Sequence, residues 1–135
     1  MKLWGLFLLA AGIVAAQGDL VRQSRQALAR AKQTATEAGA ACRANEYEKC
    51  EALLTEAQAA IQKARDSLDK TGINPRTNPR HYKDAEIRTR ETLKLLQALA
   101  PFIHPEDRAH YDAVVKRISE INDYLLSAIM TKKRK

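Results

Sequence analysis

The sequence contains few residues that interrupt helices. Among its 135 residues are 5 glycines and 4 prolines, and aromatic residues make up 5% of the chain. The stretch from Asp19 to Ala44 has no proline and a single glycine, so propensity alone favours a helix there. Together with the apolar spacing described below, this composition predicts an all-α fold.

Signatures of catalysis are also missing from the sequence. It has no glycine-rich phosphate loop, no Gly-x-Ser-x-Gly turn, no His-Glu-x-x-His motif and no cysteine pair at zinc spacing. We therefore expect a protein that is not an enzyme and that carries no cofactor.

No apolar run is long enough to cross a membrane. The clearest one runs from Leu3 to Ala16, which is shorter than the roughly 20 residues that a spanning helix needs. Lys2 precedes this run, and Ala15 and Ala16 end it with small residues, as in a secretory signal peptide. We expect residues 1–16 to be such a peptide, cleaved near Ala16, and the protein to be secreted or periplasmic. An uncleaved N-terminal anchor is the alternative.

Residues 17–135 suit a single domain, because a chain of this length can bury a core of its own. The formal net charge of the whole chain is +7, and loss of Lys2 with the signal peptide lowers it to +6. A basic exported protein can meet anionic partners such as lipid headgroups or cell-wall polymers, although the charge can also serve solubility alone. We expect no nucleic-acid partner, because export separates the chain from most nucleic acid.

Apolar residues between Asp19 and Lys70 recur at intervals of three and four, the heptad pattern of paired helices. If the two segments fold back on each other, Cys42 faces Cys50 and Leu28 faces Ala64, and large residues mostly oppose alanines. This predicts an antiparallel hairpin over about residues 19–71. Its seam positions are Leu28, Ala31, Ala35, Ala38 and Cys42 in the first helix, and Tyr47, Cys50, Leu54, Ala57, Ile61, Ala64 and Leu68 in the second.

The two cysteines fall in one layer of this hairpin, and export would place them where disulfides persist. We expect a structural disulfide between Cys42 and Cys50, contributing about 2 to 3 kcal/mol by closing a short loop. A redox pair would normally show Cys-x-x-Cys, so that function and two unpaired buried thiols are the weaker alternatives. Asn45 and Glu48 have the spacing of a capping box, which predicts that Asn45 caps the second helix.

A connector with proline and glycine follows over residues 72–78. Gly72 suits the left-handed position after a helix, and the Asn-Pro-Arg triplet that ends at Arg76 is repeated so as to end at Arg80. We expect Asn78 to cap the next helix, with Pro79 in its first turn. The segment is either a rigid linker or a recognition loop that presents two arginines.

A second hairpin is predicted over about residues 79–131. Further apolar residues lie off the seams of both hairpins, so we expect the hairpins to pack together as an up-down four-helix bundle. An elongated pair of hairpins that forms a homodimer is the alternative. The seam positions are Tyr82, Ala85, Thr89, Thr92, Leu96 and Leu99 in the third helix, and Tyr111, Val114, Ile118, Ile121, Leu125 and Ala128 in the fourth; the residues off the seams include Val21, Leu53, Ile87, Leu93, Leu95, Phe102, Val115, Leu126 and Ile129.

The nearest approach to a metal site in the sequence is a local group of possible ligands around the turn between the last two helices. His104, Asp107 and His110 are weak candidates, because acids and capping residues belong at helix starts in any case. We expect the rings of three tyrosines to be buried at the edge of the core while their hydroxyls remain in solvent. A surface on which a sugar or another ligand stacks is the alternative. The three are Tyr47, Tyr82 and Tyr111.

Unbalanced positive charge forms the remaining candidate site. Four of these cations are adjacent, from Lys132 to Lys135. Near an anionic membrane each contributes about 1 kcal/mol of binding free energy. A frayed, solvated tail is the alternative interpretation. The candidate anion-binding residues are Arg22, Arg25, Arg76, Arg80, Lys132, Lys133, Arg134 and Lys135.

Our leading hypothesis is a non-enzymatic exported helical bundle that acts as a scaffold, adaptor or envelope-associated interaction module. The first alternative is a binder of anionic surfaces, such as membrane headgroups or cell-wall polymer, that uses the basic tail and the arginines. The second is a carrier of a small ligand or metal, which would require a cavity in the core.

Overall fold

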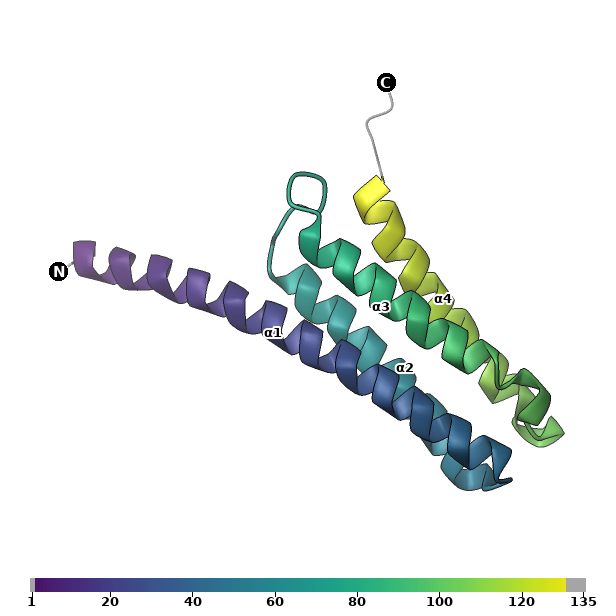
Figure 1. Cartoon of the computed structure of the whole chain (residues 1–135). Coiled ribbons are helices and arrows are strands. Elements are labelled where there is room, and N and C mark those ends of the chain that lie inside the picture. Colours follow the sequence, from purple (N-terminus) through teal and green to yellow (C-terminus); the bar gives the residue numbers. More distant parts are fainter. Residues whose placement is uncertain (1, 131–135) are drawn as a thin grey trace.

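The computed structural model describes the backbone of residues 2–130 and the side chains of residues 16–130, and it confirms the all-α fold (Figure 1). None of the helices in this part of the chain is both long enough and apolar enough to span a membrane. The α-helices are α1 (Lys2–Arg43), α2 (Tyr47–Lys70), α3 (Arg80–Gln97) and α4 (Arg108–Met130), and two short 3-10 helices, η1 (Ala100–Phe102) and η2 (Pro105–Asp107), join α3 to α4.

The four helices form an up-down bundle of two antiparallel hairpins, as predicted. α1 packs against α2 and α3 against α4, while across the hairpins α1 contacts α3 and α2 contacts α4 (Figure 1). Because successive helices alternate in direction, the neighbours that meet across the hairpins run parallel to each other. The connector therefore joins α2 to a helix that is not its main neighbour, and it must cross the end of the bundle to do so.

The seam of the first hairpin is buried in the predicted register. Ala31, Ala38 and Ile61 are fully buried, and Ser24 Oγ donates a 2.9 Å hydrogen bond to the Ala64 carbonyl across the pair. Tyr47 is an exception, because its side chain is 42% exposed. Tyr47 lies closer to the tip of the hairpin than the Cys42–Cys50 layer, where α1 has already ended, so α1 does not cover it.

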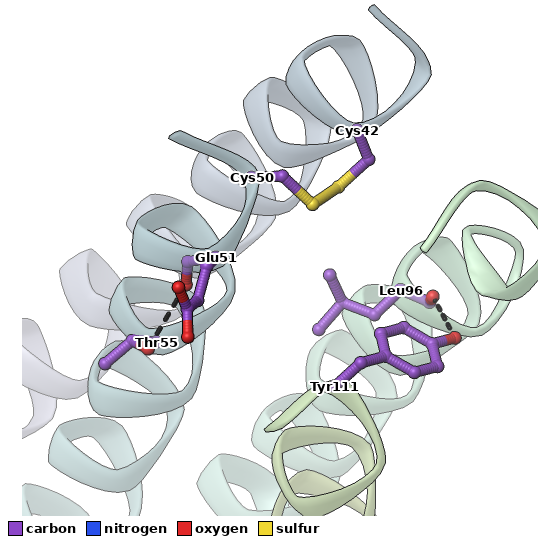
Figure 2. Close-up of a disulfide and its surroundings, with 6 residues drawn as sticks. All are labelled: Cys42, Cys50, Glu51, Thr55, Leu96 and Tyr111. Carbon is purple, nitrogen blue, oxygen red and sulfur yellow. Dashed lines mark hydrogen bonds between the residues drawn. A yellow bond between two sulfur atoms is a disulfide. The ribbon is translucent and has the colours of Figure 1, made fainter. Parts of the chain in front are cut away.

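The disulfide between Cys42 and Cys50 closes the tip of this hairpin (Figure 2). The two Cα atoms are 4.9 Å apart, within the range of about 4.4 to 6.8 Å that the bond accepts. Both cysteines are buried, and no described cysteine is free. The predicted pairing is confirmed, and it pins the register of the two helices.

The turn at the tip differs from the prediction. Asn45 has φ 62°, and the Glu46 and Asn45 amides donate to the carbonyls of Ala41 and Cys42 at 2.9 and 3.2 Å. This is a Schellman motif, in which a left-handed residue ends a helix. Asn45 therefore terminates α1, and the predicted capping box was wrong. So short a turn requires a positive φ, which asparagine tolerates better than most residues.

The second hairpin also has the predicted seam, and Tyr111 Oη donates a 2.7 Å hydrogen bond to the Leu96 carbonyl (Figure 2). The residues off the seams behave differently from the expectation. Leu53 and Leu93 are buried, but most of the others are 37% to 46% exposed to solvent, because the inner faces of the two seams already fill the space between the hairpins. The exposed ones are Ile87, Leu95, Phe102 and Leu126.

A buried carboxylate joins α3 to α4 within this hairpin. Glu86 is 6% exposed, receives two hydrogen bonds from Arg90 at 2.9 and 3.0 Å, and contacts Asn122 Nδ2 at 3.3 Å. The Arg90 hydrogen bonds are the main cause that holds the pKa of Glu86 below its usual value, with burial opposing them. Glu86 is thus a paired structural charge.

Candidate functional site

The end of the bundle that carries the α2–α3 connector is where α1 extends beyond the packed helices and where α4 ends (Figure 1). We call it the connector end; it comprises Lys70–Lys83, the last two turns of α4 and the adjacent part of α1. Gln17 Nε2 donates a 2.8 Å hydrogen bond to the Thr71 carbonyl, which fixes α1 beside the connector. The part of α1 before this point extends beyond the end of α2.

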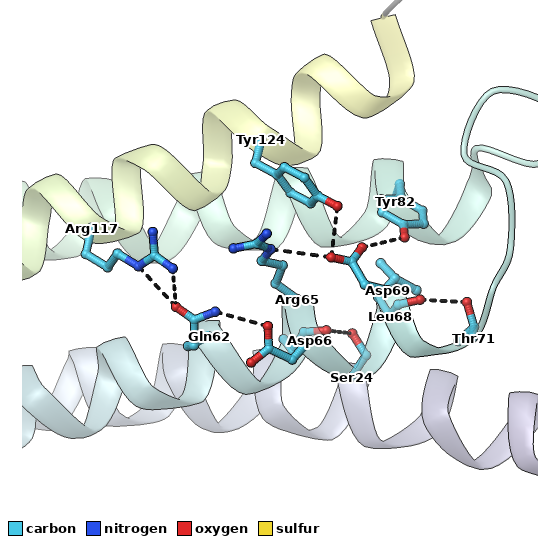
Figure 3. Close-up of polar contacts among 11 residues, drawn as sticks. Ser24, Gln62, Arg65, Asp66, Leu68, Asp69, Thr71, Tyr82, Arg117 and Tyr124 are labelled. Carbon is cyan, nitrogen blue, oxygen red and sulfur yellow. Dashed lines mark hydrogen bonds and ion pairs between the residues drawn. The ribbon is translucent and has the colours of Figure 1, made fainter.

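Three polar pairs set the height of α4 against α2. Thr55 contacts His110 at 2.9 Å, Gln62 accepts from Arg117 at 2.7 Å, and Asp69 accepts from Tyr124 at 2.8 Å; the partners in every pair are 55 positions apart (Figure 3 shows the last two). Successive pairs are one heptad apart, the repeat of helices that stay in contact along their length. The two hairpins are therefore held in one register.

The last of these pairs belongs to a junction of three helices. Asp69 of α2 accepts hydrogen bonds from Tyr82 of α3 at 2.7 Å and from Tyr124 of α4, and forms an ion pair with Arg65 at 3.4 Å (Figure 3). The Arg65 guanidinium also lies 4.1 Å from the centre of the Tyr124 ring.

Both tyrosines of the junction remain neutral donors. Burial is the main cause that raises the pKa of Tyr82 and of Tyr124, and the Asp69 carboxylate that accepts from each hydroxyl raises it further. The two hydroxyls therefore stay protonated and able to donate at neutral pH, and the junction holds the start of α3 and the end of α4 beside the end of α2.

The connector itself is tied down by local hydrogen bonds. Thr71 Oγ1 donates to the Leu68 carbonyl at 2.6 Å and accepts from the Ile73 amide at 3.1 Å, and Gly72 has φ 75°, the left-handed conformation that was predicted. Asn74 Oδ1 accepts from the Arg76 amide at 2.9 Å, an Asx turn. These contacts give the connector a defined path.

Asn78 does not cap α3. The helix begins at Arg80 with Pro79 in the N-cap position and no capping side chain, while the Asn78 amide donates to the Asn74 carbonyl at 2.9 Å. The predicted cap was wrong because the first Asn-Pro pair folds into a turn that takes up the second asparagine. Of the two asparagines, it is Asn74 whose side chain organises the loop.

Positive charge is concentrated along this path. Residues 70–83 contain no aspartate or glutamate. Their four cationic side chains are exposed, and none forms an ion pair with a described residue. Because the ion pairs found among the described residues involve other side chains, these four cations remain available to an external anion. They are Lys70, Arg76, Arg80 and Lys83.

The structure separates the other predicted anion-binding residues. Arg22 forms an ion pair with Asp19, which offsets part of its charge. Arg25 is exposed on α1 and has no ion pair within the described range. The tail of Lys132, Lys133, Arg134 and Lys135 lies outside the described residues.

Apolar side chains accompany the cations at the connector end. Leu126 is 44% and Met130 62% exposed, and both lie on the last turns of α4, just beyond the level that the Asp69–Tyr124 contact fixes. Ile129 packs partly against the core between them. This end therefore presents cations and two large apolar side chains.

The candidate metal ligands lie near the opposite end and are not brought together. His104 Nδ1 accepts from the Glu106 amide at 3.2 Å and its ring packs 4.6 Å from that of Tyr47, whereas His110 contacts Thr55. Nowhere in the described chain do three or more His, Cys, Asp or Glu side chains gather as they would around a metal ion. The two histidines have separate side-chain partners, and Asp107 is joined to His104 through its backbone amide, which donates to the His104 carbonyl at 2.8 Å.

A shallow groove of about 330 Å³ lies between α1 and α2, on their outer side. Its floor is formed by Ala27 and Ala60, and its rim by Gln23, Gln26, Arg30 and Lys63. Arg30 is paired with Glu56 at 2.8 Å. The groove is an open surface feature and does not provide the core cavity that a carrier would require.

Sequence reasoning missed Asp69 and Tyr124, the two residues that hold the connector end in place. The signal was present, because Thr55, Gln62 and Asp69 repeat every seven residues on α2, as do His110, Arg117 and Tyr124 on α4. The two series can be recognised as contacting pairs only when it is known that α2 and α4 are neighbours in the bundle.

Comparisons with models of known protein families, with curated proteins and with solved structures found no match to this chain.

Proposed function

We propose that this chain is an exported, non-enzymatic interaction module of the cell envelope, and that its connector end binds an anionic surface. The observation that carries the proposal is the set of four exposed cations in Lys70–Lys83, with no carboxylate in the same stretch and no ion pair to a described residue. Cations fixed on one rigid edge act together on an anionic partner.

Export is supported by two features of different kind. The signal-like run from Leu3 to Ala16 is the pattern of a cleaved leader, and the disulfide of Cys42 and Cys50 is a bond typical of exported proteins. Mass spectrometry of the protein released by an expressing cell tests this part. A mature N-terminus near Gln17 is expected, and an intact Met1 in the released fraction would contradict it.

The binding part is tested with residues 17–135 on an immobilised polyanion such as heparin. This fragment contains every buried side chain of the described core, which begins at Ser24. Arg76→Gln with Arg80→Gln should elute at clearly lower salt than the unchanged chain. The matched control, Lys49→Gln with Lys94→Gln, removes the same charge from exposed residues toward the disulfide end.

The control should elute close to the unchanged chain. If both double variants shift equally, the chain binds through its net charge alone, and the assignment to the connector end is wrong. Circular dichroism of each variant verifies that the helices are intact.

A further inference from the structure

We infer that the anionic partner of the connector end is a lipid bilayer, and that Leu126 and Met130 enter its interfacial layer while the connector cations contact headgroups. The inference rests on the proposed function and names its partner. A soluble polyanion can satisfy the cations alone. Exposed leucine and methionine beside those cations gain free energy only where an apolar phase adjoins the negative charge.

The apolar pair and the cations lie at one height in the bundle. The Asp69–Tyr124 hydrogen bond of 2.8 Å places position 124 level with the end of α2. Leu126 and Met130 follow within two turns and are four residues apart, so they share one helix face. Tyr82, held by the same carboxylate at 2.7 Å, places Arg80 and Lys83 at that height too.

The course of the backbone distinguishes the connector end from the opposite end. α1 extends beyond the packed helices at the connector end (Figure 1), whereas the disulfide closes the opposite end of the first hairpin. The charge also fits, because no acidic residue follows Asp123 in α4 or in the remaining chain. Arg76 and Arg80 project from a connector whose hydrogen bonds keep its shape.

Sedimentation of residues 17–135 with lipid vesicles tests the inference. One set of vesicles contains phosphatidylglycerol and phosphatidylcholine in equal parts, and the other contains phosphatidylcholine alone. We expect binding to the anionic set only. Loss of two cations, in Arg76→Gln with Arg80→Gln, should weaken that binding about thirtyfold, since each is worth roughly fivefold near an anionic membrane.

The apolar contribution is tested by Leu126→Ser with Met130→Ser. This variant should lose about tenfold in vesicle binding but keep its elution from heparin. Ile87→Ser is the control, because Ile87 is 46% exposed on α3 but lies beyond Tyr82, on the side of the Asp69 junction that faces away from the connector. Its vesicle binding should be unchanged.

Each other outcome has a defined meaning. Retention on heparin without binding to anionic vesicles overturns the bilayer and leaves the proposed function standing, whereas failure of both overturns both. Equal vesicle binding by Leu126→Ser with Met130→Ser and by the unchanged chain overturns insertion. Concentration-dependent self-association that the same variant abolishes, without vesicle binding, would assign the apolar pair to contact with a second copy of this chain and overturn the inference.

Discussion

Replacement of Asp69 by alanine should loosen the joint between the two hairpins. The change removes the acceptor of two hydroxyl hydrogen bonds, from Tyr82 at 2.7 Å and from Tyr124 at 2.8 Å, and the ion pair to Arg65. Hydrogen bonds to a charged group contribute about 1.5 to 3 kcal/mol each. The Asp69 side chain is 30% exposed, and water will offset part of the loss, so we expect unfolding to require about 2 to 3 kcal/mol less.

The assay is urea unfolding of residues 17–135, monitored by circular dichroism at 222 nm, a wavelength that reports helix content. The unfolding free energy usually falls by about 1 to 3 kcal/mol per molar urea. Asp66→Ala is the matched control, because Asp66 is an exposed neighbour whose side chain accepts a 3.1 Å hydrogen bond from Gln62. That variant should change stability by less than about 0.5 kcal/mol. If Asp69→Ala and Asp66→Ala lose the same stability, the three-helix junction does not hold the hairpins together.

A double-mutant cycle sharpens the same test. Tyr82→Phe alone removes one hydroxyl, and its effect should largely disappear when Asp69 is already alanine, with a coupling energy of about 1 kcal/mol or more. Additive effects would mean that the hydroxyl and the carboxylate act independently, contrary to the contact seen in Figure 3.

Three further predictions concern other parts of the fold. Cys42→Ala with Cys50→Ala should lower the unfolding free energy by about 2 to 3 kcal/mol and retain the helical spectrum; a wholly unfolded variant would contradict the seam packing. Asn45→Ala should cost about 1 kcal/mol and Asn45→Gly little, because φ is 62° there; equal losses in thermal melts would count against the Schellman turn. Glu86 has a folded pKa below its usual 4.5, so its stabilisation is present above pH 4.5 and is lost as the pH falls through the folded value. The urea midpoints of Glu86→Gln should therefore fall less steeply on acidification than those of the unchanged chain. Parallel curves would refute the role of Glu86 as a stabilising paired charge.

The hairpins were predictable because their signal is local and redundant. Cys42, Leu54 and Ile61 occupy positions where the period of apolar residues, the turn and the helix propensity all agree, and all three are buried. The same holds for Leu96 and Ile118 in the second hairpin.

The failures occur where a local motif has two solutions. Asn45 can begin one helix or end another, and the short turn decided for the second by its need for a positive φ. Asn78 has the residue type of a cap, but the preceding turn at Asn74 bonds its amide. Sequence spacing alone does not contain the tertiary arrangement that resolves such cases.

The candidate site was predictable only in part, because its charged residues stand out in the sequence but the position of its apolar residues does not. Arg76 and Arg80 stand out in sequence, because no acid accompanies them. The predicted up-down topology already places the end of α4, with Leu126 and Met130, at the same end of the bundle. Their axial position beside the end of α2 required the Asp69–Tyr124 contact, which only the structure shows.

The most direct measurement of the central claim is the depth at which single tryptophans meet a bilayer. The one tryptophan of the chain is Trp4, so residues 17–135 contain none. Thr77→Trp in the connector and Glu51→Trp beside the disulfide each supply one probe, to be mixed with anionic vesicles whose acyl chains carry bromine as a quencher. The account predicts a blue shift and quenching for Thr77→Trp and neither for Glu51→Trp. Equal quenching of both probes, or quenching of Glu51→Trp alone, would contradict a bundle that docks by its connector end.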